Sequence, residues 1–439
     1  MNLAEKIKKA GVVGAGGAGF PTHIKAGSTV EFVLANGAEC EPLLHKDFEI
    51  MLNRPDQIVR GMNLMINVTG AKKGIFGIKG KNARAIAAIE DNLDDSAIEM
   101  CVLGDFYPSG DEYELVYEGT KRLIPPHGIP LDVGCLVNNV ETFYNISNAV
   151  DDIPVTEKFV CVAGMVKNPS SFFIPVGTSF KDLIKIAGGT TIDDYAIFIS
   201  GILMGKLTFD ENDVVTKTCA GIIILPADHY LVNRMNRPKQ DMNRIGKSAC
   251  DQCSYCTELC PRYLLGYDVQ PHKVMRSLVF TTSGKEMWNQ YADLCCACGL
   301  CSLYACPEDL YPREACVQSK QEMRVQGLPK YEQKKEVKVH PVKEGRRVPL
   351  KQLMKRLDLT RFEKPTPFIE EVETPKRVKI LLQQHVGVPS EPVVKIGDIV
   401  NKGDLIGRIP EGKLGANVHA SISGMVTHVN HDYVMIDNS

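Results

Sequence analysis

The chain has 439 residues, which is too long for one ordinary core and predicts about three domains. Its 51 lysines and arginines nearly balance its 53 aspartates and glutamates, so the formal net charge of −2 gives no sign of a nucleic-acid partner. There is no apolar run of about eighteen residues, and no direct membrane span is expected. Because the start also lacks a signal peptide, we expect a cytoplasmic protein whose fifteen cysteines bind metal before they form disulfides.

A glycine-rich stretch, GVVGAGGAGFPTHIK, runs from Gly11 to Lys25. Its glycines allow positive φ and a close approach to a ligand, and Pro21 is typical of a helix start. The backbone amides could cradle a phosphate. The spacing matches neither G-x-G-x-x-G nor a P-loop, however, so a plain turn is an equal alternative from these residues alone.

The next predicted element is an apolar strand within residues 31–41, which ends in Asn36, Glu39 and Glu41. Polar residues at the end of a strand that follows a glycine loop are typical of the nucleotide crevice of α/β sheets. Strands and amphipathic helices alternate through residues 1–152. We therefore expect an α/β domain there.

Eight cysteines between residues 248 and 307 form two runs, each closing on Cys-Pro. The first run has the bacterial ferredoxin spacing, C-x2-C-x2-C-x3-C-P, and predicts [4Fe-4S] clusters whose fourth ligands cross over between runs. The second run has one residue more before its last cysteine, which leaves its fourth ligand less certain. The predicted ligands are Cys250, Cys253, Cys256, Cys260, Cys295, Cys298, Cys301 and Cys306.

Two structural zinc sites are the main alternative for these cysteines, because Cys-x2-Cys pairs also bind zinc. The three-residue steps with Cys-Pro favour clusters. Cys296 and Cys316 are expected to be neighbours of the ligands and not ligands themselves.

Short strands are predicted for residues 153–235 and again for residues 374–439, where Gly-Asp and Lys-Gly turns indicate a small barrel. Between the cysteines and this barrel, residues 320–364 hold 14 Lys and Arg against 6 Asp and Glu. We expect residues 321–373 to form a basic linker, either solvated or docked on an acidic partner.

Four motifs add a family resemblance: GGAGFPT at 16–22, N-x2-E-x-E-P at 36–42, YPSGDEYEL at 107–115 and NNVET at 138–142. With the cysteine runs, they resemble the flavin and iron–sulfur family that contains the complex I 51-kDa subunit, the RnfC subunit and cobalamin reductases of the PduS type. The resemblance covers nearly the whole chain. The order of motifs and the carboxyl-terminal barrel are most similar to PduS.

This resemblance implies a multidomain α/β architecture. The expected parts are a domain for FMN and NADH (1–152), an SLBB β-grasp domain (153–235), a ferredoxin-type helical domain with two [4Fe-4S] clusters (236–320), the linker, and a barrel-sandwich hybrid (374–439). A carrier role of the barrel is rejected, because Ser423-Gly424-Met425 stands where a carrier lysine would be expected.

The resemblance also implies roles for individual residues. The residues expected to bind the flavin or the nicotinamide nucleotide are Gly14, Gly16, Gly17, Gly19, Phe20, Lys25, Asn36, Tyr107, Gly110, Asn138, Asn139, Glu141 and Thr142. The acids Glu39, Glu41 and Glu112 would face the cofactor or the nicotinamide ribose and are the candidate catalytic residues.

The implied function is an NADH-dependent oxidoreductase. Because a hydride carries two electrons and a cluster accepts one, a flavin must stand between them. The acceptor would be cobalamin or an acceptor protein, and packaging in a bacterial microcompartment, as for PduS relatives, is left open. The alternatives are an electron-relay subunit that feeds a partner such as an amino-acid reductase, and a scaffold that the clusters merely stabilise.

Overall fold

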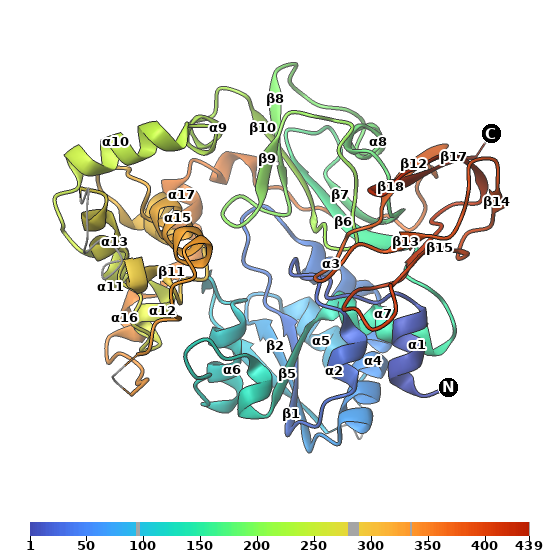
Figure 1. The fold of residues 1–439 in the computed structure, drawn as a ribbon, viewed down its shortest axis with the longest axis horizontal. Helices are drawn as coiled ribbons and strands as arrows, with labels where there is room; N and C mark the ends of the chain where they lie inside the picture. Colours follow the sequence, from blue (N-terminus) through green and yellow to red (C-terminus); the bar gives the residue numbers. More distant parts are fainter. Residues whose placement is uncertain (94–96, 280–288, 334–335, 439) are drawn as a thin grey trace.

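The computed structural model describes residues 1–93, 97–279, 289–333 and 336–438. Figure 1 shows an α/β part at the bottom, a second sheet above it, a helical part at the left and a small β part at the right, near both termini. The expected multidomain α/β architecture is confirmed. Within the described residues, no helix is both long and apolar enough to cross a membrane.

A four-stranded parallel sheet forms the centre of the first domain. Its order is β3-β2-β1-β5, with β1 (Phe32–Gly37), β2 (Lys73–Lys79), β3 (Ile98–Leu103) and β5 (Cys135–Asn139). Side chains alternate along a strand, so Val33 and Leu34 enter different apolar cores. Strands β1, β2 and β5 are thus buried on both faces, which explains their nearly continuous apolar sequences, whereas the edge strand β3 is partly exposed.

Helices cover both faces of this sheet. They are α1 (Leu3–Lys9), α2 (Thr22–Ala26), α3 (Lys46–Asn53), α4 (Pro55–Thr69), α5 (Ala83–Glu90), α6 (Glu112–Thr120) and α7 (Val140–Val150), with the 3-10 turn η1 (Pro130–Val133). The side chain of Asp111 caps the start of α6, and that of Asn139 caps α7. These two caps hold the YPSGDEYEL and NNVET motifs near the carboxyl edge of the sheet, where α/β proteins bind nucleotides.

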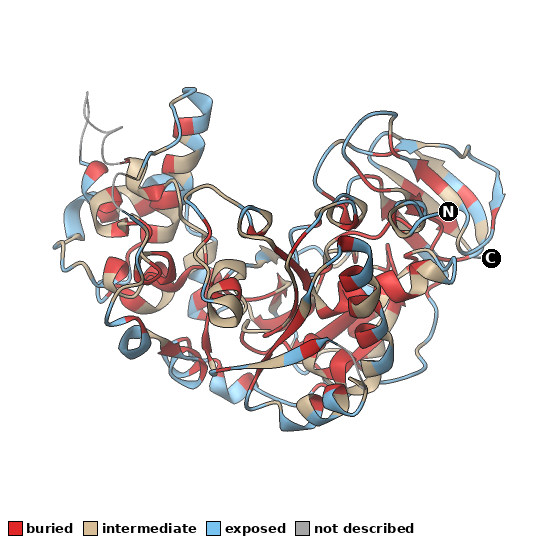
Figure 2. Ribbon diagram, turned by 90° about the horizontal axis from the view of Figure 1, so that it is seen from below, coloured by how far each residue is buried: buried red, intermediate tan, exposed pale blue. Residues whose placement is uncertain are grey.

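The second sheet has the order β7-β6-β10-β8-β9. Its strands are β6 (Glu157–Gly164), β7 (Ser170–Pro175), β8 (Tyr195–Ile199), β9 (Lys206–Thr208) and β10 (Gly221–Pro226). Only the β6–β10 pairing is parallel among the described pairings of this sheet. Helix α8 (Phe180–Ile186) packs on it through Phe180 and Leu183. Figure 2 shows buried residues concentrated along the strands in the middle of the molecule.

Short helices and turns carry the two cysteine runs. They are α9 (Tyr230–Met235), α10 (Lys239–Ala249), α11 (Tyr255–Glu258), α12 (Pro261–Leu264), α13 (Pro271–Ser277), η2 (Gln290–Ala292), the π-helical turn η3 (Cys301–Ala305) and α15 (Pro312–Val325). Pro261 and Pro312 each occupy the first position of a helix. The N–H that proline lacks would have no hydrogen-bond partner within the helix at this position.

Part of the segment expected to be a linker is packed against the rest of the protein. It contains α16 (Lys343–Arg346), β11 (Val348–Pro349), α17 (Leu350–Arg356) and η4 (Thr360–Phe362), and β11 pairs with β4 (Phe106–Tyr107) of the first domain. Lys343 is buried and contacts Glu114 and Glu118 of α6 at 2.7 Å each. The acidic partner of Lys343 is thus a helix of the same chain.

The carboxyl-terminal barrel consists of two small sheets with the orders β12-β18-β17-β14 and β13-β15-β16. The strands are β12 (Arg377–Leu381), β13 (Glu391–Pro392), β14 (Ile399–Val400), β15 (Leu405–Arg408), β16 (Val418–His419), β17 (Gly424–Val429) and β18 (Tyr433–Asp437). Ile380, Ile406 and Val426 belong to the core between the sheets.

Candidate cofactor site and cysteine centres

The glycine-rich stretch forms a closed loop from Gly11 to Pro21. Val13 bridges Pro21, and the Gly14 N–H donates to the Phe20 carbonyl at 2.9 Å. At its tip, Gly17 has φ +110° and open space where a side chain would stand. Backbone of this conformation favours glycine, and its exposed amides can approach a ligand closely.

The loop is tied to the NNVET motif at the end of β5. The Ala15 N–H donates to Thr142 Oγ1 at 3.0 Å. A side chain on Gly16 would meet Asn139 Cβ at 3.2 Å, so these two motifs are in contact. Thr142 and Gly16 therefore position the loop against the sheet edge.

Lys25 and Glu112 face each other beside Asn138. The Lys25 ammonium donates to the Val137 carbonyl at 2.6 Å and to Asn138 Oδ1 at 3.4 Å. Burial lowers the pKa of Lys25 and raises that of Glu112, and each opposes the shift of the other. A positive and a negative group thus share this edge of the sheet.

Among the residues that the structure describes, eleven buried side-chain polar atoms have no hydrogen-bond partner. Three of them, Thr22 Oγ1, Ser109 Oγ and Asn138 Nδ2, come one from each of three family motifs. Leaving such atoms unpaired costs about 1–3 kcal/mol each, so each of them is expected to bind a water, an ion or a ligand. Thr22 and Ser109 were not predicted as site residues, although both stand inside the quoted motifs.

Two of these atoms, those of Ser109 and Asn138, belong to one edge of the sheet. Asn36 of β1 lies opposite Asn139 of β5, next to Asn138. The Asn36 amide donates to the Gly110 carbonyl at 2.9 Å, which brings the turn that contains Ser109 to the same strand end. With the glycine loop, this edge fits a phosphorylated, polar-edged cofactor such as FMN.

Glu39 belongs to a buried carboxyl pair at this edge. Its Oε2 accepts the Asp47 N–H at 3.0 Å, and Asn139 donates to Asp47 Oδ2 at 2.8 Å. Burial raises the pKa of Glu39 to about 8, with a further contribution from Asp47 that Lys46 opposes. Glu39 can therefore hold a proton near neutral pH.

Glu41 points to a different part of the molecule. Its carboxylate accepts the N–H groups of residues 202–204, each at 2.9 Å, from the turn after β8. Burial raises its pKa, and these hydrogen bonds oppose the rise. Both oxygens of Glu41 thus fasten the first domain to the second sheet.

Glu141 also connects the first domain to the second sheet. It is buried, accepts from Lys46 at 2.8 Å, pairs with Lys158 of β6, and accepts the Phe159 N–H at 3.1 Å. Burial would raise its pKa, but the two lysines hold it below the ordinary value. Glu141 supports the glycine loop indirectly, because its partner Lys158 also donates to the Ala15 carbonyl of the loop at 3.2 Å.

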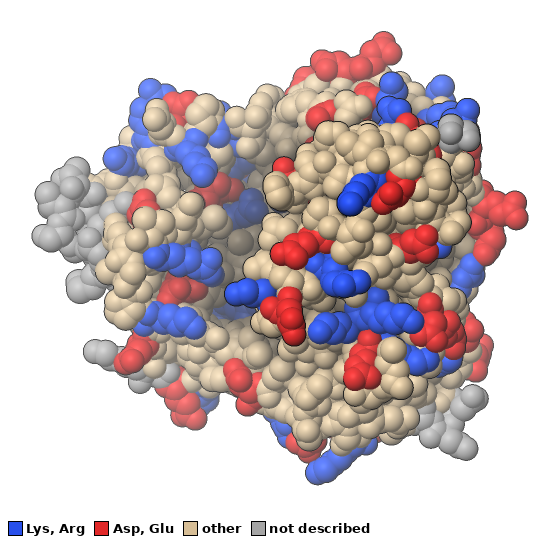
Figure 3. Space-filling model, turned by 45° about the vertical axis from the view of Figure 1, so that its right-hand side comes forward, with Lys and Arg blue, Asp and Glu red and all other residues tan. Residues whose placement is uncertain are grey.

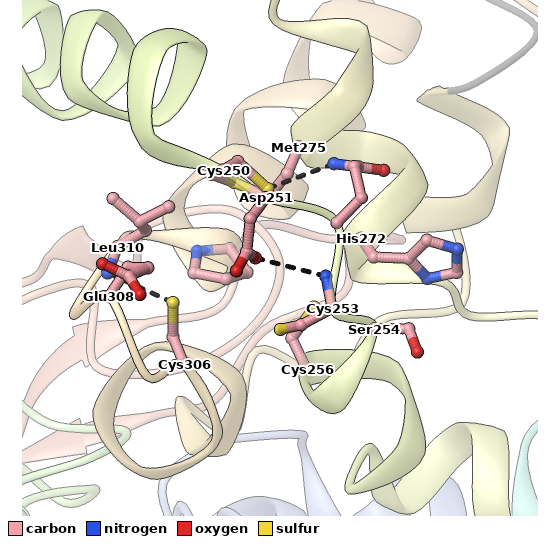
Figure 4. Close-up of a pocket in the computed structure, with 12 residues that line it drawn as sticks. Cys250, Asp251, Cys253, Ser254, Cys256, His272, Met275, Cys306, Glu308 and Leu310 are labelled. Carbon is pink, nitrogen blue, oxygen red and sulfur yellow. Dashed lines mark hydrogen bonds between the residues drawn. The ribbon is translucent and has the colours of Figure 1, made fainter.

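The first three cysteines of the first run line one cavity with the last cysteine of the second. Cys250, Cys253, Cys256 and Cys306 converge there, as Figure 4 shows. Four thiols from two separate loops suit a [4Fe-4S] cluster, and this exchange of the fourth cysteine is typical of two-cluster ferredoxins. Cys253 is exposed, so this group, called the outer set below, reaches the surface.

The other four cysteines form an inner set. Cys260 packs with Cys295, and the thiols of Cys298 and Cys301 both interact electrostatically with Cys260. The π-helical turn begins at Cys301 and ends one residue before Cys306. A π turn takes one residue more than an α turn, so it accommodates the longer spacing of the second run.

Two further cysteines lie beside the inner set. Cys316 of α15 hydrogen-bonds with Cys295, and Cys296 does so with Cys298. Both therefore neighbour predicted ligands.

The inner set adjoins the first domain. The Tyr107 hydroxyl donates to the Cys298 carbonyl at 2.6 Å. Arg262, which follows Cys260-Pro261, donates to Asp111 at 2.9 Å and lies 3.4 Å over the Tyr113 ring. The YPSGDEYEL motif thus contacts the cysteine loop through Tyr107 and the sheet edge through Gly110.

Figure 3 shows a hollow between the helical cysteine part, at the left, and the rest of the molecule, with Lys and Arg side chains around it.

Four family models match the chain. The Nuo51 FMN-binding domain matches residues 7–148, the SLBB domain 159–202, the 4Fe-4S dicluster domain 249–311, and the RnfC barrel sandwich hybrid domain 361–438. The predictions of FMN-binding and iron–sulfur domains are confirmed, and zinc is set aside as the metal of the cysteines.

Curated relatives match over nearly the full length. Cobalamin reductase PduS of Salmonella typhimurium is 36% identical over 438 residues, which cover 99% of this chain and 96% of that protein. PduS of Citrobacter freundii is 35% identical over 440 residues with the same coverage. One subunit of the proton-translocating ferredoxin:NAD(+) oxidoreductase complex of Clostridium ljungdahlii is 33% identical over 264 residues, 59% of this chain and 55% of that protein.

A solved structure of an NAD+-reducing [NiFe]-hydrogenase shares the fold, with a TM-score of 0.50 and 20% identity, over 75% of this chain and 63% of that one. Fold, motifs and relatives agree. The chain belongs to the family of flavin and iron–sulfur oxidoreductases that includes cobalamin reductase PduS and the RnfC subunits.

Proposed function

We propose that this protein is an NADH-dependent reductase that binds FMN and two [4Fe-4S] clusters and delivers electrons to cobalamin. The observation that carries the flavin part is that Ser109 and Asn138, at one edge of the sheet, and Thr22, directly after the glycine loop, each keep a buried polar atom without a hydrogen-bond partner among the described residues. Cobalamin as acceptor is supported by proteins named cobalamin reductase, which are 35% and 36% identical to this chain over 99% of its length.

The FMN would be held by the glycine loop and the strand ends. Backbone amides near Gly17 and the Lys25 ammonium supply positive charge for its phosphate. Asn138 and Ser109 supply partners for polar atoms of the ring. A bound flavin accepts two electrons together and releases them one at a time.

Two of the three candidate acids would act on the nicotinamide side. Glu39 holds a proton near neutral pH, and Glu112 lies beside Lys25, so both can adjust charge at the cofactor edge. Glu41 is left out of the chemistry in this proposal, because its two oxygens are engaged by residues 202–204.

The two cysteine sets would lie in series. The inner set contacts the first domain through Tyr107 and Arg262, and the outer set reaches the surface at Cys253. We therefore place the docking site of the acceptor beside Cys253, at the end away from the flavin.

The test is anaerobic reconstitution with iron, sulfide and FMN, followed by NADH and then cob(III)alamin. We expect the flavin absorbance to bleach, reduced-cluster signals to appear in electron paramagnetic resonance, and the cobalamin spectrum to change to the reduced form. Boiled protein and free FMN with NADH are the controls for direct reduction.

A different result would select the relay function. If dithionite reduces the clusters and NADH does not, the protein receives its electrons from a partner. If NADH reduces flavin and clusters but cobalamin is unchanged, only the acceptor is wrong.

A further inference from the structure

The barrel lies on the glycine loop, far from both cysteine sets. The Val386 N–H of the barrel donates to the Gly19 carbonyl at 2.9 Å. A side chain on Gly19, whose φ is +67°, would stand 3.2 Å from His385 Cα and 2.9 Å from Thr218. The end of the loop at Gly19 therefore packs between the barrel and the segment that leads into β10 of the second sheet.

A buried lysine makes the corresponding contact at the start of the loop. Lys217, in the segment before β10, donates to the Gly11 carbonyl and to the Asn417 carbonyl of the barrel, both at 2.7 Å. Its own N–H donates to the Gln384 side chain at 2.8 Å. One residue thus joins the glycine loop, the second sheet and the barrel.

Lys217 has no acidic partner among the described residues. It is 3% exposed, and burial alone lowers its pKa to about 7. The titratable groups that face it are the imidazoles of His385 and His419, whose pKa values burial lowers first and Lys217 lowers further. The role of Lys217 is therefore not to form an ion pair. Its ammonium group donates hydrogen bonds to two buried carbonyl groups that would otherwise lack a donor.

We propose that the carboxyl-terminal barrel is a structural part of the flavin site, and that Lys217 is the positioning residue through which it holds the glycine loop. This rests on the proposed FMN function. Lys217 and Val386 hold the two ends of the loop, Gly11 and Gly19, so the tip at Gly17 keeps one conformation. A preformed loop loses less conformational entropy when it binds its ligand.

The first test needs no cofactor. Hydrogen exchange of residues 11–21 is compared in Lys217→Met, in Ser421→Ala and in the unsubstituted protein. Ser421 is a matched control, because it is buried and fastens the barrel to the Val176 carbonyl at 2.6 Å without touching the loop. We expect faster exchange of residues 11–21 in Lys217→Met only; equal exchange in all three proteins overturns the proposal.

The second test measures FMN affinity by quenching of flavin fluorescence. Lys217→Met is expected to weaken binding about tenfold, since two buried carbonyls lose their donor, and Ser421→Ala to change it less than about twofold. An equal loss in both variants would mean general loosening and contradict the role of Lys217.

The unsubstituted protein gives a third readout, which does not depend on how the variants fold. FMN should protect residues 384–386 of the barrel from exchange together with residues 11–21. Protection of the loop without the barrel overturns the proposal. If FMN fails to bind the unsubstituted protein, the proposed function fails, while the cofactor-free exchange result still decides the role of Lys217.

Discussion

The first domain meets its two large neighbours through interfaces of different chemistry. Toward the second sheet it offers carboxylates: Glu41 accepts three backbone N–H groups, and Glu141 pairs with buried Lys158. Toward the cysteine domain it offers the Tyr107 hydroxyl, which donates to a cysteine carbonyl, and Asp111, which accepts from an arginine near the cysteines. Acids of the family motifs therefore fasten both interfaces: Glu41 and Glu141 contact the second sheet, and Asp111 contacts the cysteine domain.

The difference teaches which contacts are structural. Removing one partner of a buried ion pair leaves an unpaired charge in the interior, which costs about 3–5 kcal/mol. A single neutral hydrogen bond such as that of Tyr107 contributes about 1 kcal/mol. Breaking the Glu141–Lys158 pair or the Arg262–Asp111 pair should thus cost more stability than removing the Tyr107 hydrogen bond.

The largest expected effect is on the cysteine side. Cys306→Ser should remove the outer cluster and leave the inner one, so the iron content should fall to roughly half, because each cubane carries four irons on four cysteines. Adding Cys250→Ser should remove no further iron, whereas adding Cys301→Ser should remove the remaining cluster. Iron analysis and electron paramagnetic resonance measure this.

Cys219→Ser is the matched control for these variants, because Cys219 is buried and packs in the core of the second sheet. It should keep its full iron content. The opposite pattern, in which Cys250→Ser adds to the loss in Cys306→Ser and Cys301→Ser does not, would mean that the runs do not exchange their fourth cysteines.

Glu141→Gln tests the fastening at the second sheet. It leaves Lys46 and Lys158 buried without their shared carboxylate and should lower the free energy of unfolding by about 3–5 kcal/mol. Urea denaturation followed by circular dichroism measures the change. Glu157→Gln breaks an exposed pair with Lys402 and should cost less than about 1 kcal/mol; similar losses in the two variants would refute the distinction.

Glu41→Gln separates a structural from a catalytic glutamate. The NH2 group of the new glutamine would replace one carboxylate oxygen and face the backbone N–H donors of residues 202–204, with which it cannot form hydrogen bonds. The free energy of unfolding is therefore expected to fall by about 1–3 kcal/mol. The KM for NADH should stay unchanged. A raised KM with unchanged stability would return Glu41 to the nicotinamide site.

The sequence predicted what depends on local spacing. Cysteine steps, the glycine loop and alternating strands and helices are short-range patterns, and the family models confirm the domains that they indicate. The roles of Glu41 and Lys217 depend on partners 161 to 206 positions away. Such partners leave no local pattern, so those contacts could not be derived from the sequence.

The sequence of the packed segment 343–362 did contain a pattern that indicates a buried helix. Its basic composition predicted a linker that is either solvated or docked on an acidic partner, yet Leu350, Leu353 and Leu357 recur at helical spacing and are buried. Apolar periodicity is the better guide here, because lysine and arginine can be satisfied by acids of the same chain, as Lys343 is by Glu114.

A further expected effect is on pH dependence and concerns Glu39, whose carboxyl pKa is raised from 4.5 to about 8 by burial and by Asp47. Between these pH values the folded protein keeps a proton that the unfolded chain releases, so stability falls as pH rises from about 4.5 to 8. Glu39→Gln removes this proton uptake and should reduce the drop in Tm between pH 5 and pH 8 by about 2–4 °C. Calorimetry in the absence of FMN measures it. An unchanged drop would mean that Glu39 is ionised at pH 7.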